Sequence, residues 1–203
     1  MRIREEALPF AVPLLVLAAA LVALGQVWPA LPPAALGLFV CAFFRDPERV
    51  STVDPRALLC PADGRVCQVA REGGRTKISV FMSLFDVHVN RSPEACTVSE
   101  MTYNRGRFLA AWSDKASLDN EQLRYRLATP RGELELVQIA GLVARRIVPF
   151  VAVGAVLGRG ERFGLIRFGS RVDLYAPEGV EVLVRVGQRV RAGATPLALW
   201  GAP

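Results

Sequence analysis

Residues 165–175 read Leu-Ile-Arg-Phe-Gly-Ser-Arg-Val-Asp-Leu-Tyr, and this stretch organises the rest of the chain. The alternation of Val172 and Leu174 with polar residues predicts a half-buried strand, and the apolar pair that opens the stretch predicts another strand before it. A Gly-Ser pair between two strands is typical of a turn or bulge, in which Gly169 adopts the unusual backbone conformation and Ser170 carries a solvent-exposed hydroxyl. Motifs elsewhere in the chain give this serine a second interpretation.

The segment after this stretch, residues 180–199, predicts short strands separated by turns. Valine recurs at every second position from 182 to 186, which is the period of a strand with one buried face. Gly187 and Gly193 are turn signals on either side of a further apolar position. The pattern resembles the barrel of lipoyl and biotinyl carrier domains, so lipoyl-like elements are expected near the C-terminus.

Most of the chain from Leu58 onward also predicts strands. Gly73-Gly74 is a turn signal between two alternating runs, and Pro130-Arg131-Gly132 is another. Residues 108–121 are polar and typical of a loop, whereas residues 141–147 are compatible with a strand or a short helix. The predicted strands are residues 65–69, 77–81, 97–103, 123–127 and 133–139. We therefore expect a mainly β fold with minor α structure, built as a β-sandwich or barrel.

The N-terminal region is different, because no charged residue occurs between Leu8 and Phe44. This apolar run is too long for a single span of about 20 residues, and residues 25–29 interrupt it near its middle. Two helices, at roughly 8–24 and 30–44, are predicted to fold as a hairpin. At about 1.5 Å per residue each helix reaches some 25 Å, so both a crossing hairpin and a re-entrant hairpin are open.

The charges at the ends of the apolar run predict its orientation. Arg2 and Arg4 precede it, Arg45 and Arg49 follow it, and the whole chain carries a net charge of +6. Positive charge favours the cytoplasmic side and attracts an anionic membrane surface. We therefore expect a membrane-associated hairpin at residues 1–45 and a body at residues 46–203 on the cytoplasmic side of the cell membrane. No zinc-finger or RNA-binding aromatic motif is present, so no nucleic-acid partner is expected.

The four cysteines favour a reducing compartment over a disulfide framework or a metal site. None of them forms a Cys-x-x-Cys pair, and the chain has a single histidine, so no metal is expected. They are Cys41, Cys60, Cys67 and Cys96.

Two motifs upstream change the interpretation of Ser170. Asp63 lies in Pro61-Ala62-Asp63-Gly64, and the only histidine, His88, lies in Asp86-Val87-His88-Val89-Asn90-Arg91-Ser92-Pro93. With Phe168-Gly169-Ser170-Arg171 after them, in this order, these blocks resemble the short form of the phosphatidylserine decarboxylase family. The resemblance runs from Phe44 to Pro177 and includes Asp114-Lys115-Ala116-Ser117 and the pair Asn120-Glu121.

The resemblance implies an enzyme that makes its own cofactor. The chain would cut itself between Gly169 and Ser170, and Ser170 would become the N-terminal pyruvoyl group of fragment 170–203, which stays associated with fragment 1–169. The amine of phosphatidylserine would form a Schiff base with this ketone, and loss of CO2 would yield phosphatidylethanolamine. The pyruvoyl group plays the electron-sink role that pyridoxal phosphate has elsewhere. Association of copies into a homo-oligomer is compatible with this interpretation.

The resemblance also assigns roles to the site residues. His88 would act as the base and proton donor, and Asp63 would orient its imidazole as in a serine-hydrolase triad. Arg91 stands where long-chain members carry a second histidine, tied to self-cleavage, so His88 must serve both steps or another residue must serve one. Arg91 and Lys115 are candidates for the lipid phosphate, as are Arg167 and Arg171. Candidates for an apolar lining, or for plain core positions, are Phe81, Met82, Leu84 and Phe85.

Two other functions fit parts of the sequence. A membrane-tethered lipoyl-like adaptor without activity would fit the C-terminal strand pattern, but the expected hairpin tips lack the Asp-Lys-Met or Met-Lys-Met sequence that takes a prosthetic group. A membrane-anchored serine hydrolase could use Ser170, His88 and Asp63, but the Gly-x-Ser-x-Gly elbow is missing at Ser170. Both alternatives predict an uncut chain.

Overall fold

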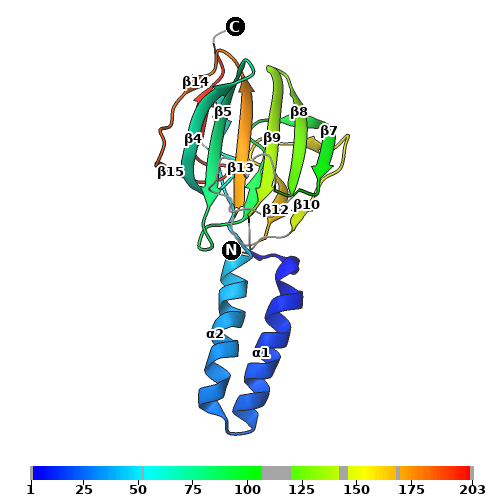
Figure 1. Cartoon of the computed structure of the whole chain (residues 1–203), viewed down its shortest axis with the longest axis vertical. Coiled ribbons are helices and arrows are strands. Elements are labelled where there is room, and N and C mark those ends of the chain that lie inside the picture. Colours follow the sequence, from blue (N-terminus) through cyan, green and yellow to red (C-terminus); the bar gives the residue numbers. More distant parts are fainter. Residues whose placement is uncertain (1, 52, 107–119, 142–145, 168–169, 202–203) are drawn as a thin grey trace. The chain divides into compact units, whose positions relative to one another are not determined.

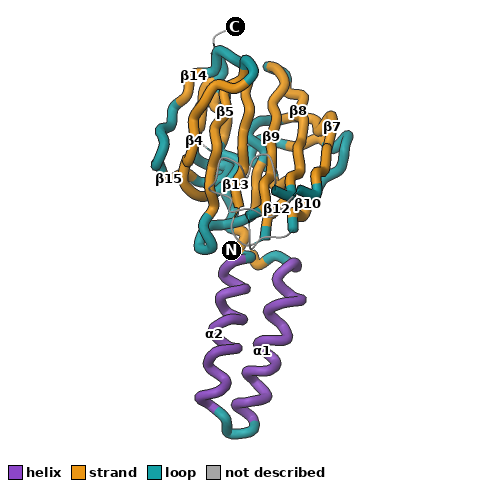
Figure 2. Tube along the Cα trace, viewed as in Figure 1, coloured by secondary structure: helices purple, strands orange, loops and turns teal. Residues whose placement is uncertain are grey.

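The computed structural model describes residues 2–51, 53–106, 120–141, 146–167 and 170–201. The chain divides into two compact units, Met1–Glu48 and Arg49–Pro203. Among the described residues, α-helix occurs only in the first unit and the second unit is built from strands (Figure 2). The prediction of a mainly β chain preceded by a helical hairpin is therefore confirmed.

The first unit is a pair of antiparallel helices (Figure 1). A 3-10 turn, Glu5–Ala7, leads into α1 (Leu8–Ala23), and α2 (Val27–Phe43) returns. The short strand β1 (Arg2–Ile3) pairs with β2 (Arg45–Asp46), which follows α2. Helix α2 begins earlier than the predicted residue 30, because Pro29 falls in its first turn, where the missing N–H of proline costs no helical hydrogen bond.

Sequence explains how this hairpin turns and packs. Gly25 has a φ of +73°, and the amides of Gly25 and Gln26 bind the carbonyls of Val22 and Leu21, so α1 ends in a Schellman motif. A Cβ added at Gly37 of α2 would lie 2.8 Å from Leu15 Cδ2 of α1, so the missing side chain allows the two helices to approach. The segment Glu5–Ala23 is long and apolar enough to cross a membrane, and Val27–Phe43 is a shorter apolar helix.

The second unit is dominated by a curled antiparallel sheet with the strand order β11-β7-β8-β9-β13-β5-β4-β15. The described residues of this unit also form two three-stranded sheets, β10-β12-β6 and β14-β16-β3. The bounds are β3 Ala57–Leu59, β4 Gly64–Glu72, β5 Arg75–Met82, β6 Val89–Arg91, β7 Cys96–Asn104, β8 Gln122–Thr129, β9 Gly132–Ala140, β10 Ile147–Pro149, β11 Val156–Leu157, β12 Arg162–Ile166, β13 Ser170–Pro177, β14 Glu181–Val182, β15 Arg189–Val190 and β16 Pro196–Leu199.

Strand β13 lies in the middle of the large sheet, between β5 and β9 (Figure 1). Val172, Leu174 and Ala176 of β13 point to the core, as the sequence alternation predicts, and all three are fully buried. Their neighbours in the same layer come from β5 and β9, and residues of β3, β12 and β16 pack in the same cluster. The hydrophobic core therefore lies between the curled sheet and the two small sheets.

The two hairpins expected from local turn signals are present. β4 and β5 are joined at Gly73 and Gly74, both with positive φ, and β8 and β9 are joined at Pro130-Arg131. Residues 180–186 differ from the expected continuous alternation, since only Glu181–Val182 is a strand within them and Val186 is exposed. The reason is that the backbone changes partners, since Leu183 binds Leu197 whereas Gly187 binds Val66 of β4.

Candidate active site

Ser170 is the first residue of the central strand β13. It pairs with Met82 of β5 on one side and with Ala140 of β9 on the other, and it is fully buried. The expected solvent-exposed hydroxyl of a simple turn is therefore excluded for this serine. Phe168 and Gly169 lie outside the described residues, so the predicted cleavage bond is seen from the Ser170 side only.

The hydroxyl of Ser170 has no hydrogen-bond partner among the described residues, although its oxygen is buried. A buried hydroxyl in this state loses its hydration without compensation, which costs about 1–3 kcal/mol. By the period of the strand, its side chain lies on the same face as the apolar Val172 and Leu174. Conversion of Ser170 to a pyruvoyl group would replace this hydroxyl by a methyl group, which suits such a position. The site therefore fits the implied group.

His88 is held directly before β6 and is 2% exposed. Its Nδ1 lies 3.0 Å from the backbone oxygen of Asp86. Because a carbonyl oxygen only accepts hydrogen bonds, Nδ1 carries the proton of the neutral ring and Nε2 is the basic nitrogen. The tautomer needed for a general base is thus set by the backbone two residues before the imidazole.

The fold brings the segments of His88 and Ser170 to the same end of β5 and β13. The backbone oxygen of His88 accepts a hydrogen bond from Ile166 at 3.4 Å, and β6 then pairs with β12. Ser170 follows Ile166 by four residues and pairs with Met82, which precedes His88 by six. Ser170 therefore lies beside Met82, and Ile166 lies beside the backbone of His88.

The connection that carries His88 is braced by Asp86, for which the sequence predicted no role. Its Oδ2 accepts hydrogen bonds from the Ser83 amide at 2.8 Å and from the Ser83 hydroxyl at 2.6 Å. The amide of Asp86 in turn donates to the Ser83 carbonyl at 3.0 Å. A serine followed three residues later by aspartate is a readable turn signal, and here it fixes the carbonyl that orients the imidazole.

Asp63 is buried at the loop before β4, 9% exposed. Its Oδ2 accepts from Arg49 Nη2 at 2.8 Å, and its Oδ1 accepts from the Ala192 amide at 2.7 Å. Burial raises the pKa of Asp63, although the Ala192 amide and the Arg49 charge oppose the rise. Its described contacts tie the segment after the first unit to the loop before β16, and its orienting role toward His88 stays a prediction.

Of the candidate ligands for the lipid phosphate, Arg91 and Arg171 are described by the structure and Lys115 is not. Arg91 is buried and donates to the Gly160 carbonyl at 3.0 Å, and a Cβ on Gly193 would lie 2.8 Å from its Cδ. Arg171 is also buried, and it forms an ion pair with Asp173 at 2.9 Å. Lys115 lies outside the described residues. Contact of Arg91 or Lys115 with the lipid phosphate therefore stays a prediction.

The Asn-Glu pair, whose role the sequence left open, lies beside the serine. Asn120 is fully buried, and its Nδ2 donates to the Ala140 carbonyl at 2.9 Å, while the Ala140 amide donates to the Glu121 carbonyl at 3.0 Å. Glu121 Oε1 also accepts from the Tyr103 hydroxyl at 3.1 Å. Asn120 and Glu121 thus hold the end of β9 that pairs with Ser170.

The candidate apolar lining is divided between the core and the surface. Met82 is fully buried and belongs to the hydrophobic core, and Phe81 is half-buried. Leu84 and Phe85, in the turn before His88, are 40% and 76% exposed. The turn that carries the imidazole therefore presents two apolar side chains to its surroundings.

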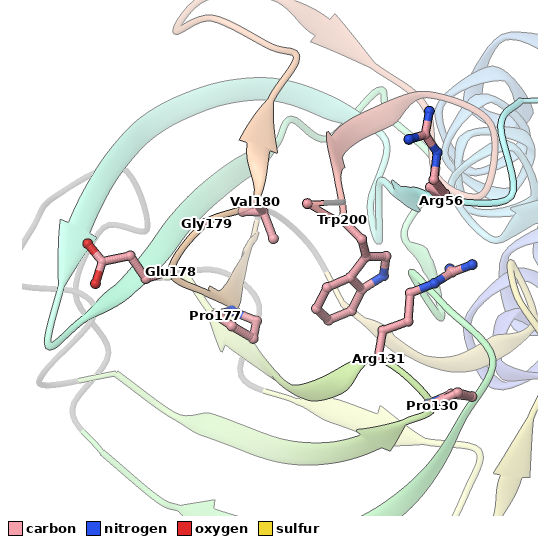
Figure 3. A pocket seen from close by; sticks show the side chains of 9 residues that line it. Arg56, Pro130, Arg131, Pro177, Glu178, Gly179, Val180 and Trp200 are labelled. Atoms are coloured by element: carbon pink, nitrogen blue, oxygen red, sulfur yellow. The ribbon is translucent and has the colours of Figure 1, made fainter. Parts of the chain in front are cut away.

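A separate pocket of about 690 Å³ lies at the other end of β13 (Figure 3). Pro177, the last residue of β13, lines it, together with Arg131 and Trp200. At about 3.3 Å per residue, that end of the strand is some 23 Å from Ser170. Arg131 and Trp200 both donate to Glu94, at 3.1 and 3.2 Å. This pocket is therefore distinct from the candidate active site.

The acidic and metal-binding side chains of the described segments do not gather into a metal site. No group of three or more histidine, cysteine, aspartate or glutamate residues lies close enough there to hold an ion. The thiol of Cys60, three residues before Asp63, donates a hydrogen bond to the Ala62 carbonyl at 2.9 Å, and burial raises the pKa of this thiol.

Comparisons with known proteins show the family of the chain. The family model described as phosphatidylserine decarboxylase matches residues 36–198. A phosphatidylserine decarboxylase proenzyme of Syntrophotalea carbinolica is 52% identical, over 80% of this chain and 79% of its own length. Proteins with the same name from Erythrobacter litoralis and Syntrophus aciditrophicus are 46% and 42% identical, covering 93% and 96% of this chain and 84% and 96% of their own lengths.

Proposed function

Because the chain belongs to the phosphatidylserine decarboxylase family, which is a family of carboxy-lyases, we propose that it converts phosphatidylserine to phosphatidylethanolamine and CO2 after cutting itself between Gly169 and Ser170. One observation carries this proposal. The hydroxyl of Ser170 is buried at the start of the central strand, and no described residue hydrogen-bonds to it. The relatives are named proenzymes, which supports a cleavage step.

The cleavage step can be written with the chain's own atoms. Ser170 Oγ attacks the Gly169 carbonyl carbon while His88 Nε2 takes its proton, and the C–N bond breaks as the C–O ester bond forms. Loss of the Cα proton of residue 170 and of the Cβ–O bond releases Gly169 as a carboxylate. The dehydroalanine left behind tautomerises to an imine, and water replaces its nitrogen, which leaves as ammonia. One water is consumed, and no external oxidant or reductant is needed.

In turnover, residues of the chain would bind the substrate, shield it from water and protonate its carbon. A pyruvoyl group at position 170 would supply a carbonyl that, joined to the substrate amine, accepts the electrons of the bond to the departing carboxylate. Burial at the end of β13 excludes water, which favours loss of a carboxylate charge. His88, with Nδ1 fixed on Asp86, would hold the proton at Nε2 and deliver it to the substrate carbon. Arg91 and Lys115 remain our candidates for the lipid phosphate.

The strand pairing supports continued association of the two fragments. Fragment 170–203 would contain β13, which pairs along its length with β5 and β9 of the other fragment. It would also contain β15, which pairs with β4, and β16, which pairs with β3. Cleavage would break one backbone bond and leave these hydrogen bonds in place, so the serine-derived group would stay where the serine was.

The N-terminal unit supports action on a lipid. The segment Glu5–Ala23 is long and apolar enough to cross a membrane, and Val27–Phe43 is apolar as well. Arginines 2, 4 and 45 flank the pair, and positive flanks favour the cytoplasmic side. We propose that residues 1–45 attach the chain to the cell membrane and that residues 46–203 act at its cytoplasmic, anionic surface.

Intact-mass analysis of the purified protein tests the function most directly. We expect two polypeptides, 1–169 and 170–203, the smaller with a blocked N-terminus whose carbonyl is trapped by borohydride in the presence of an amine. Ser170→Ala should remain one chain and release no CO2 from phosphatidylserine vesicles. Ser79→Ala, at another fully buried serine one strand away, is the matched control and should cut normally. A full-length Ser170→Ala protein that still decarboxylates phosphatidylserine would overturn the proposal.

A further inference from the structure

Three polar side chains cross the hydrophobic core in a continuous line, which we call the core polar chain: Tyr125 of β8, Gln138 of β9 and Asn90 of β6. The Tyr125 hydroxyl donates to Gln138 Oε1 at 2.8 Å, and Gln138 Nε2 donates to Asn90 Oδ1 at 2.7 Å. Asn90 Nδ2 then approaches Met82 Sδ at 3.6 Å. All of these residues are fully buried.

A hydrogen-bonded chain in this place needs an explanation beyond stability. Buried amides and hydroxyls lose their hydration, and hydrophobic side chains of similar volume can replace them at little cost when every partner is replaced together. The surroundings are nevertheless shaped for Gln138, because a Cβ on Gly164 of β12 would lie 3.1 Å from its Nε2. Each bond is also directional, so the chain fixes the spacing between strands that apolar contacts would leave adjustable.

Asn90, Gln138 and Met82 lie near the candidate active site, whereas Tyr125 lies farther along the sheet, opposite Leu136. Asn90 follows His88 by two residues, and both side chains are buried. Gln138 precedes Ala140, the β9 partner of Ser170, by two residues, and Met82 is the β5 partner of Ser170. Figure 1 shows β5, β13 and β9 side by side in this order. The core polar chain therefore connects β6, the strand that follows His88, to β5 and β9, the two strands that pair with Ser170.

We propose that Asn90, Gln138 and Tyr125 are positioning residues for self-cleavage, holding His88 Nε2 in register with Ser170 Oγ. This inference rests on the proposed function. The chain ties β6, which follows the imidazole, to β9, which flanks the serine, and Asn90 also contacts β5 on the other flank. A displacement of about 1 Å between reacting groups can cost on the order of a hundredfold in rate, so a modest loosening of these strands is enough to slow the reaction.

The decisive variant replaces all three residues of the core polar chain by apolar residues of similar shape. It combines Tyr125→Phe, Gln138→Met and Asn90→Leu. It leaves none of the three partners with an unsatisfied polar atom, so we expect it to fold with a Tm close to wild type. The rate of self-cleavage is measured by pulse–chase of the full chain in cell-free synthesis. We expect a rate at least about tenfold lower than wild type. Leu127→Ala, which opens a cavity on β8, is the control that lowers Tm without touching the chain.

The pH profile of the cleavage rate separates positioning from titration or general destabilisation. In the triple variant we expect a lower plateau with the same midpoint, because His88 remains the base. If the triple variant does not fold, Tyr125→Phe alone decides, with an expected slowing of at least about threefold.

A wild-type cleavage rate in the folded triple variant, or in Tyr125→Phe, would overturn this inference while leaving the proposed function intact. The inference would also fail if Leu127→Ala, which lowers Tm but leaves the three polar side chains in place, were slowed as much as the triple variant. A wild-type chain that never cuts itself would instead overturn the proposed function.

Discussion

Asn120 donates its side-chain amide to the backbone carbonyl of Ala140 at 2.9 Å, and Ala140 is the residue that β9 sets opposite Ser170. The asparagine is fully buried, so this contact is shielded from water. The position of the serine therefore depends on a side chain that comes from a separate part of the chain.

For Asn120→Ala we expect self-cleavage to slow by about tenfold, because the end of β9 loses the contact that holds it against Ser170. The measurement is the fraction of cut chain over time after synthesis. Asn104→Ala is the control, since the side chain of Asn104 also bonds to the backbone, by accepting from the Gly106 amide, but is exposed. Equal rates for the two variants would remove Asn120 from the site.

Replacing His88 by Gln should abolish decarboxylation and slow self-cleavage by roughly a hundredfold or more, the usual contribution of a positioned general base. Release of CO2 from phosphatidylserine vesicles and the fraction of cut chain are measured separately. Normal cutting with lost turnover would show that another residue serves cleavage. This outcome is of interest because Arg91 occupies the place of the second histidine in long-chain members.

Asp86→Ala should lower both activities by about tenfold although it leaves the imidazole in place, because the turn that orients Nδ1 loses two hydrogen bonds to Ser83. Asp86→Asn keeps an oxygen acceptor and should restore most of the rate. Ser83→Ala, which removes one of the two bonds, is expected to fall between them. If Asp86→Ala and Asp86→Asn behave alike, the brace has no part in catalysis.

The raised pKa of Asp63 predicts a pH dependence of stability with a definite sign. The folded state binds the proton more tightly than the unfolded state, so stability from this carboxyl is present below its ordinary pKa of 3.8 and falls as the pH rises through the higher folded value. Urea unfolding is followed from acid to neutral pH in the uncut Ser170→Ala background. Asp63→Asn should lack this slope, and a slope of equal size in both proteins would contradict the assignment.

Gly193→Ala should destabilise the second unit by about 2 kcal/mol. This loss combines the cost of a side chain in a left-handed backbone conformation with the cost of a steric clash. Its φ is +67°, and the new Cβ would meet Arg91 Cδ at 2.8 Å. Gly73→Ala is a matched control, since its φ is +59° but its Cβ would meet nothing within 4 Å. The control should lose about 1 kcal/mol, the backbone part alone. Unfolding free energies in urea compare the two, and equal losses would mean that Arg91 moves freely aside.

Local parts of the fold were predictable because their signals are local. Gly73-Gly74 and Pro130-Arg131 joined the strands that their turn chemistry indicates, and the interruption after Leu24 ended α1. The place of β13 between β9 and β5 was not predictable, since it depends on pairing between residues far apart in sequence. The same applies to Val186, which is exposed because the backbone changes partners beside it.

Candidate site residues could be named from the sequence only where their signals are local. Ser170 and His88 belong to motifs that can be read in one segment, whereas the proposed roles of Asp86 and of the core polar chain depend on side-chain contacts that only the structure shows. A signal existed for Gln138, which occupies a core-facing position of β9 in phase with Leu134 and Leu136. A polar residue at an apolar position of a strand predicts a buried partner, but the sequence does not say which strand supplies it.

The central position of β13 has a consequence for how long the mature molecule lasts. The uncut precursor folds with all its strands in one polypeptide. Once cut as proposed, the protein could refold only if the two polypeptides associated again and β13 of the smaller one inserted between β5 and β9. Reassembly would then depend on concentration, and losses on heating would be one-way. The working lifetime of such an enzyme would be set by the rate at which its sheet unfolds, and not by its free energy of unfolding.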